Sequence, residues 1–139
     1  MTFKSISEIA GSAMAAQTVR LNTIASNLAN AESVGGTEAA TYHARKPVFA
    51  AVMNDNASGQ QAGGKVQVLD VIQSTEPLRK AYEPGNPMAN TDGNVYYPNV
   101  SEVAEMTDMM SASRAFETNV EVLGRVGQMQ QSLLKLGES

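Results

Sequence analysis

The feature that most constrains this fold is a helical repeat of apolar residues over the last third of the chain. Between residues 99 and 137, apolar side chains recur at steps of three and four in two runs, one through Met106 and Met110 and the other through Val122 and Val126. This spacing predicts one long amphipathic helix, and the second run has the spacing of a coiled coil. Because the two runs are offset around the helix, they imply more than one packing neighbour. An ordinary core helix with an irregular apolar face is the alternative.

The ends of this helix carry terminal signals. Pro98 disfavours a helical conformation at the residue before it, so the helix is expected to begin at Asn99. Asn99 is the expected N-cap, and Glu102 stands at the position of a capping-box partner. Gly137 is the expected C-cap.

Residues 3–31 form a second stretch with apolar residues at helical spacing, which predicts a helix at the opposite terminus. Its only charged residues are Lys4, Glu8 and Arg20, and most other positions are small or neutral polar. An exposed helix of this length normally has a charged outer face. The pattern favours close packing by several helices, although a helix in the centre of a globular core has the same composition.

The middle of the chain predicts a small β-rich insert. Residues 42–53 and 65–74 are expected to form an antiparallel hairpin, with Pro47 at an edge or a bulge and residues 54–64 as a mobile loop. Four prolines and two glycines between residues 77 and 98 predict turns and short extended pieces, with a tight turn at residues 90–94.

The predicted fold class is therefore mainly α. We expect the two terminal helices to pair as an antiparallel coiled coil with the small hairpin and turn-rich insert between them. The expected units are residues 1–35 for the N-terminal helix, 36–98 for the insert and 99–139 for the C-terminal helix.

Composition argues against several classes of protein. The net charge of −4 is spread along the chain and no cluster of Lys and Arg is present, which argues against nucleic acid as a partner. No apolar run approaches the roughly 20 residues that a transmembrane helix needs. Ser5, Ser7 and Glu8 interrupt any apolar signal-peptide core, so a cleaved secretory signal is not expected.

No pattern typical of an active site or a cofactor site is found. The chain has no cysteine, and His43 is its only histidine. Residues 59–65 match the spacing of a phosphate-binding loop up to Lys65, but Val66 follows where a Ser or Thr hydroxyl must reach magnesium. A nucleotide-binding protein that uses this loop is a hypothesis of a different class, and a flexible hairpin loop is the preferred interpretation. We therefore expect no catalytic activity, no metal and no cofactor.

Several motifs resemble those of bacterial flagellar axial proteins. The N-terminal ones are IAGSA at residues 9–13, RLN at 20–22 and, above all, ASNLANA at 25–31. The C-terminal ones are YPNV at 97–100, EM at 105–106, SASRAF at 111–116 and NVEVL at 119–123. YEPGNP at 82–87, ANTDG at 89–93 and the short insert are similar to the proximal rod members of that family. Asn86 departs from the histidine common before Pro87.

The resemblance implies a structural subunit of the basal-body rod, the drive shaft that transmits torque, located in the periplasmic part of the flagellum. It implies export by the flagellar type III apparatus without a cleaved signal. The implied partners are other copies of the chain, the rod proteins FlgB and FlgF and the adaptor FliE, with no direct membrane insertion. In that family the terminal helices form an inner coiled-coil layer around the central channel. A soluble coiled-coil adaptor is the alternative.

The residues expected to form the assembly and coiled-coil interface lie on the apolar faces of the two helices. They are Met14, Leu21, Ile24, Asn27, Leu28, Met106, Met110, Phe116, Val122, Val126, Met129 and Leu133.

Overall fold

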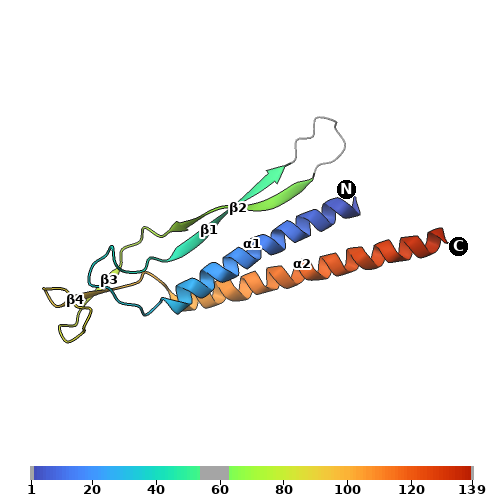
Figure 1. Ribbon diagram of the computed structural model, residues 1–139. Coiled ribbons are helices and arrows are strands. Elements are labelled where there is room, and N and C mark those ends of the chain that lie inside the picture. The colour runs from blue at the N-terminus through green and yellow to red at the C-terminus, as the bar shows by residue number, and fades with distance from the viewer. Residues whose placement is uncertain (1, 54–62, 139) are drawn as a thin grey trace.

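The structure is a computed structural model that describes residues 2–53 and 63–138 of the 139-residue chain. Two long helices enclose four strands in sequence, as Figure 1 shows. In chain order the elements are α1 (Phe3–Ala29), β1 (Arg45–Met53), β2 (Gly64–Gln73), β3 (Arg79–Tyr82), β4 (Asn94–Tyr97) and α2 (Glu102–Gly137). The predicted terminal helices and the β insert between them are therefore confirmed.

Helix α1 is closed at both ends by its own polar side chains. At its start, the Ser5 amide donates to the Thr2 hydroxyl at 3.2 Å and the Thr2 amide donates to the Ser5 hydroxyl at 3.0 Å, a reciprocal capping box. At its end, the amide of the Asn30 side chain donates to the Ser26 carbonyl at 2.8 Å. The bonds at the start satisfy amides that have no partner within the helix, and at the end the Ser26 carbonyl also accepts from the Asn30 backbone amide at 3.1 Å.

Helix α2 begins later than predicted, at Glu102, with Ser101 as the N-cap and no capping bond from its side chain. The prediction that Asn99 caps this helix is wrong. The Asn99 side chain instead accepts from the Ala44 amide at 2.7 Å and donates to the Glu76 carbonyl at 2.8 Å. It thus joins the segments on either side of the hairpin. Gly137 is the last helical residue and Glu138 is the C-cap.

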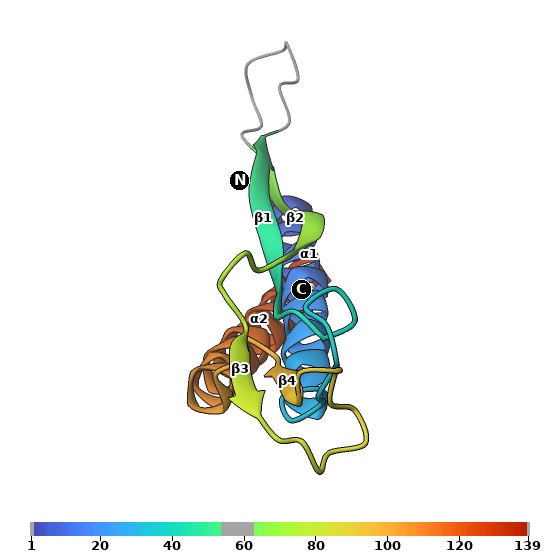
Figure 2. The ribbon, with the colours of Figure 1, turned by 90° about the vertical axis from the view of Figure 1, so that its left-hand side faces the viewer.

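The two helices lie side by side and run in opposite directions, so that both termini lie at one end of the molecule (Figure 1). Helix α1 also packs against β1 and β2, whereas α2 has no packing contact with either strand in the described part of the chain. In Figure 2 the hairpin lies above α1, and α2 lies beside α1 to its left. Residues of β1 and of the first turns of α2 nevertheless line one shared pocket with α1. Helix α2 is the longer helix, and its last turns extend past the start of α1 (Figure 1).

The β1–β2 hairpin is antiparallel, as predicted, and pairs Arg45 with Gln73 at one end and Met53 with Gly64 at the other. Its register shifts between Val48 and Phe49, close to Pro47, which agrees with the expected bulge. The Ser12 hydroxyl of α1 accepts a hydrogen bond from the Val66 amide at 3.0 Å and holds β2 on the helix. The predicted mobile loop at residues 54–64 lies mostly outside the described residues.

The second pair of strands, β3 and β4, is joined by the predicted turn. The Asn90 side chain accepts from the amides of Asp92 and Asn94 at 3.0 and 2.9 Å. Gly93 has a φ of 76°, a conformation that favours glycine. Gly35 and Tyr96 exchange two backbone hydrogen bonds, which fix the chain after α1 to β4.

The hydrophobic core is small. Alanine supplies four of the seven buried apolar residues of the described chain. Among the described residues, sixteen large apolar side chains are exposed, and nine of them belong to α2. Exposed apolar surface on this scale is typical of interaction sites.

Candidate assembly surfaces

The residues expected to form the interface separate into three groups by burial. Those buried within the chain are Ile24, Asn27 and Val126, those half-buried are Met14, Leu21, Leu28, Phe116 and Val122, and those exposed are Met106, Met110, Met129 and Leu133. Eight of the twelve residues are thus at least partly covered within one molecule, and the other four are exposed.

The contact between the helices follows the second apolar run of α2. Helix α1 is the one helix or strand that packs against α2 in the described residues, so the buried side chains of α2 mark the side that meets α1. These are Ala112 and Val126, with Ala115, Asn119 and Val122 half-buried between them. Their steps of three and four keep one face of the helix against its partner.

An ion pair also joins the two helices and was not predicted. The Arg20 guanidinium of α1 contacts the Asp108 carboxylate of α2, and Arg20 also donates to the Gln17 side chain at 3.4 Å. Arg20 is one of three charged residues in α1. Its isolation in a helix of small residues was a signal that a specific partner exists, but the partner is 88 positions away in sequence.

Asn27 connects α1 to the start of β1. Its side-chain oxygen accepts from the Tyr42 hydroxyl at 2.8 Å and from the Arg45 amide at 2.9 Å, while its side-chain nitrogen donates to the Arg45 carbonyl at 2.9 Å. The Ser26 and Tyr42 hydroxyls lie 3.1 Å apart. The polar residues of the 25–31 motif thus form hydrogen bonds within the molecule. They cap the end of α1 and attach the hairpin to it.

The face of α2 that points away from α1 carries the other apolar run. Val103, Met106 and Met110 follow steps of three and four and are 76%, 51% and 58% exposed. Positions seven residues apart share one side of the helix, and here they are Val103, Met110 and Glu117. This outer face is therefore apolar in its first turns and acidic at Glu117.

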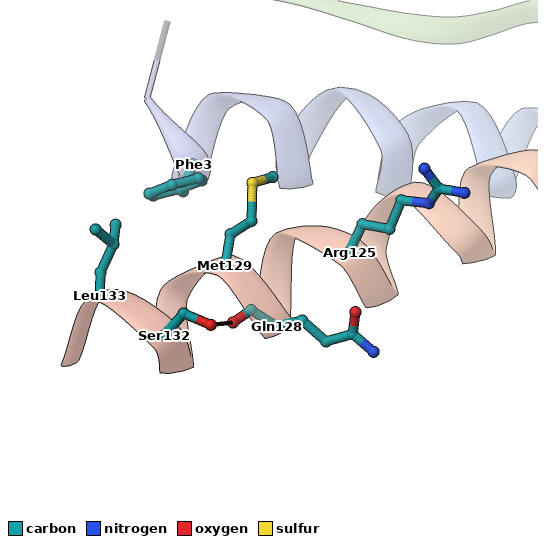
Figure 3. Close-up of a pocket in the computed structure, with 6 residues that line it drawn as sticks. All are labelled: Phe3, Arg125, Gln128, Met129, Ser132 and Leu133. Carbon is teal, nitrogen blue, oxygen red and sulfur yellow. Dashed lines mark hydrogen bonds between the residues drawn. The ribbon is translucent and has the colours of Figure 1, made fainter. Parts of the chain in front are cut away.

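A groove lies where the start of α1 meets the last turns of α2. Its volume is about 630 Å³, and it is lined by Phe3, Arg125, Gln128, Met129, Ser132 and Leu133. Figure 3 shows the Met129 and Leu133 side chains pointing from α2 toward the Phe3 ring. The groove is mainly apolar, and Met129 and Leu133 are each about half exposed.

The exposed side of α1 has almost no large side chains. After Lys4 and Glu8, the exposed positions at steps of three and four are Gly11, Ala15, Thr18, Asn22, Ala25 and Ala29. Small residues allow the backbones of neighbouring helices to approach closely. This stripe agrees with the absence of a charged outer face noted in the sequence.

The insert contains a hydrogen-bonded carboxylate. The Tyr97 hydroxyl donates to one Glu83 oxygen at 2.7 Å and the Asn86 amide donates to the other at 3.0 Å. These two bonds, with the Tyr97 bond the stronger influence, hold the pKa of Glu83 below its ordinary value, and the same bond raises the pKa of Tyr97. The Arg79 guanidinium lies 4.2 Å from the centre of the Tyr97 ring.

We expect the β3–β4 region to loosen in acid. Because the pKa of Glu83 in the folded chain is below its ordinary value of 4.5, its stabilising effect is present above pH 4.5 and is lost as the pH falls through the lower, folded value. The Tyr97 ring resonances, followed by NMR against pH, should report this change. Glu83→Gln should remove the pH dependence, and an unchanged titration in that variant would contradict the assignment.

The described residues contain no group of three or more His, Asp and Glu side chains placed to hold a metal ion. Within the same residues, no helix is long and apolar enough to cross a membrane. Lys65 and Val66 lie in β2 rather than before a helix, as the sequence indicated, so the phosphate-binding pattern has no helix N-terminus behind it. Residues 59–62 of that pattern lie outside the described residues.

Relatives of known identity match the chain over nearly its whole length. Residues 8–36 match the family described as "Flagella basal body rod protein", and residues 91–136 match "Flagellar basal body rod FlgEFG protein C-terminal". The chain is 49% identical over 138 residues to the flagellar basal-body rod protein FlgC of Salmonella typhimurium, covering 99% of this chain and 100% of the relative. It is 42% identical to FlgC of Yersinia enterocolitica with the same coverage. It is 35% identical to FlgC of Agrobacterium fabrum, over 94% of this chain and 91% of the relative.

The two family matches fall on the two helices, where the sequence motifs and the assembly surfaces lie. The full-length similarity to rod proteins favours the rod over a soluble adaptor. The chain belongs to the FlgC family of flagellar basal-body rod proteins, which are structural subunits of the rod and not enzymes.

Proposed function

We propose that this chain builds the proximal rod together with copies of itself, FlgB, FlgF and the adaptor FliE. In this proposal α1 and α2 form an inner coiled-coil layer around the central channel, and the β insert packs outside it. The observation that carries the proposal is the division of the predicted interface. One apolar run of α2 packs against α1, while the other run and the last turns of α2 remain exposed.

The energetics support a subunit completed by its neighbours. Burying one large apolar side chain is worth about 1.5 to 3 kcal/mol. Nine such side chains are exposed on α2, and the core inside the molecule is mostly alanine. Assembly can therefore bury apolar side chains that the single molecule leaves in water.

Export without a cleaved signal is part of the same proposal. The capping box at Thr2 and Ser5 and the Phe3 ring beside Met129 belong to the helix pair. Cleavage within the first turns would remove residues that the fold uses. We therefore propose that the flagellar type III apparatus exports the chain with its N-terminal helix intact.

Ala15→Glu should abolish rod assembly without unfolding the single molecule. Ala15 is exposed in the small stripe of α1, and glutamate has nearly the helix propensity of alanine, so the helix should persist. A long charged side chain would nevertheless hold a neighbouring helix away. Motility on soft agar and the amount of the chain in isolated basal bodies should both fall to the level of a deletion strain.

The matched control is Ala39→Glu, which places the same side chain on an exposed loop residue. This variant should swim normally. Circular dichroism of both purified variants should match that of the unmodified chain. Normal swimming of Ala15→Glu would argue against helix packing on this stripe.

A further inference from the structure

The methionines of this chain lie on its surface and not in its core. Of the seven methionines in the described residues, six are exposed and Met14 is half-buried. The buried apolar side chains in the same part of the chain are those of alanine, valine and isoleucine. A chemical change at a methionine sulfur therefore alters the surface of the molecule and leaves the core contacts in place.

Three of the exposed methionines gather on one part of α2. Met106, Met109 and Met110 are 51%, 38% and 58% exposed. Side chains three and four positions apart are neighbours on a helix, so the Met106 thioether lies beside those of Met109 and Met110. The Arg20–Asp108 ion pair joins the same part of α2 to α1. These three methionines, the methionine cluster, therefore lie on an ordered and accessible part of the fold.

An exposed thioether is a site for two-electron oxidation. With hypochlorous acid as the oxidant, the sulfur gains an S–O bond, the O–Cl bond breaks, and chloride and a proton leave. The sulfur loses two electrons and the chlorine gains them. The thioether is apolar, whereas the product, methionine sulfoxide, is polar and carries a hydrogen-bond acceptor. Oxidation thus makes an apolar surface polar.

We propose that the methionine cluster is an oxidation site that decides whether a free copy of this chain can enter the rod. In the reduced form, the three thioethers are apolar surface that rod assembly can bury. In the oxidised form, the same burial would leave sulfoxide oxygens without hydrogen-bond partners, which is unfavourable. Because methionine sulfoxide reductases restore the thioether, the control is reversible. This inference rests on the proposed assembly of the rod and adds a chemical control to it.

The first test is made on the purified, full-length chain. Mild treatment with hypochlorous acid should add one oxygen atom to each residue of the cluster, located by mass spectrometry of peptides, before Met14 reacts. Circular dichroism and the urea midpoint should stay unchanged, because none of the described methionines is buried. Reaction of Met14 ahead of the cluster, or unfolding when the cluster is oxidised, would overturn the inference.

Met106→Leu, Met109→Leu and Met110→Leu, combined in one chain, separate the cluster from all other targets of the oxidant. Leucine has nearly the volume and helix propensity of methionine and has no sulfur. Each chain is induced in a deletion strain, with or without a sublethal dose of hypochlorous acid. The oxidant should lower the amount of the unmodified chain in isolated basal bodies several-fold and that of the leucine variant much less. Because all other proteins are the same in both strains, the difference is due to the cluster.

The matched control is Met53→Leu with Met88→Leu, which removes two exposed thioethers outside α2. It should be as sensitive to the oxidant as the unmodified chain. Equal loss of the unmodified chain and the leucine variant of the cluster would overturn the inference, as would protection by the control variant. Absence of the unmodified chain from basal bodies without oxidant would instead refute the proposed function, so the two failures are distinguished.

Glutamine variants measure the same effect without an oxidant. Met106→Gln with Met110→Gln places two polar amides in the cluster, and glutamine is a good helix former. The amount of this chain in basal bodies should fall several-fold, whereas Met53→Gln with Met88→Gln should assemble as the unmodified chain does. Normal incorporation of the first variant would contradict the proposed effect of polarity in the cluster.

Discussion

Val126→Asp is expected to separate the two helices, with a loss of about 3 to 5 kcal/mol in the free energy of unfolding. Val126 is 4% exposed on the side of α2 that meets α1. A carboxylate at this position loses its hydration and gains no partner, and the valine contacts are lost as well. Urea unfolding followed by circular dichroism at 222 nm, a wavelength that reports helix content, should show a large fall in the midpoint. Rods should not form.

Val120→Asp is the matched control for this prediction. It introduces the same side chain on the same helix, six positions earlier, where the valine is 46% exposed. The carboxylate then remains in water, and the urea midpoint should change little. Equal destabilisation by the two variants would mean that α2 does not pack on α1 through the side that bears Val126.

Asn27→Leu is expected to detach the hairpin from α1 and to cost about 2 kcal/mol or more, at about 1 to 3 kcal/mol for each buried polar group left without a partner. The groups concerned are the Arg45 amide and the Arg45 carbonyl, because the Tyr42 hydroxyl keeps the Ser26 hydroxyl as a partner at 3.1 Å. Asn27 is 1% exposed, so water has little access to replace the lost bonds. Hydrogen exchange of the Arg45 amide should become much faster in this variant.

Two further variants separate the hydrogen bonds from a general effect of the substitution. Asn22→Leu makes the same change at an exposed position of α1 and should leave exchange at Arg45 unaltered. Tyr42→Phe removes the hydroxyl donor alone, and its effect should be smaller and not additive with that of Asn27→Leu. Unchanged protection of the Arg45 amide in Asn27→Leu would show that the hairpin is held by other contacts.

Asn27 illustrates the limit of prediction from periodicity. The sequence predicts an assembly and coiled-coil interface residue at this position, whereas in the structure Asn27 is buried and binds the start of β1. The repeat did not reveal that the amide binds the backbone at Arg45, because hydrogen-bond partners depend on how the chain turns between positions 27 and 45. Asn99 shows the same limit, since a residue suited to capping a helix holds Ala44 and Glu76 instead.

The sequence by itself determined the two helices, the antiparallel hairpin, the turn at Asn90 and the two apolar runs of α2. These follow from local rules, because helical spacing, strand spacing and turn chemistry involve residues a few positions apart. The tertiary structure alone decided which apolar run of α2 meets α1 and which stays exposed. It also decided that Arg20 pairs with Asp108. These contacts join distant parts of the chain, so their geometry exists only once the helices and the hairpin have packed together.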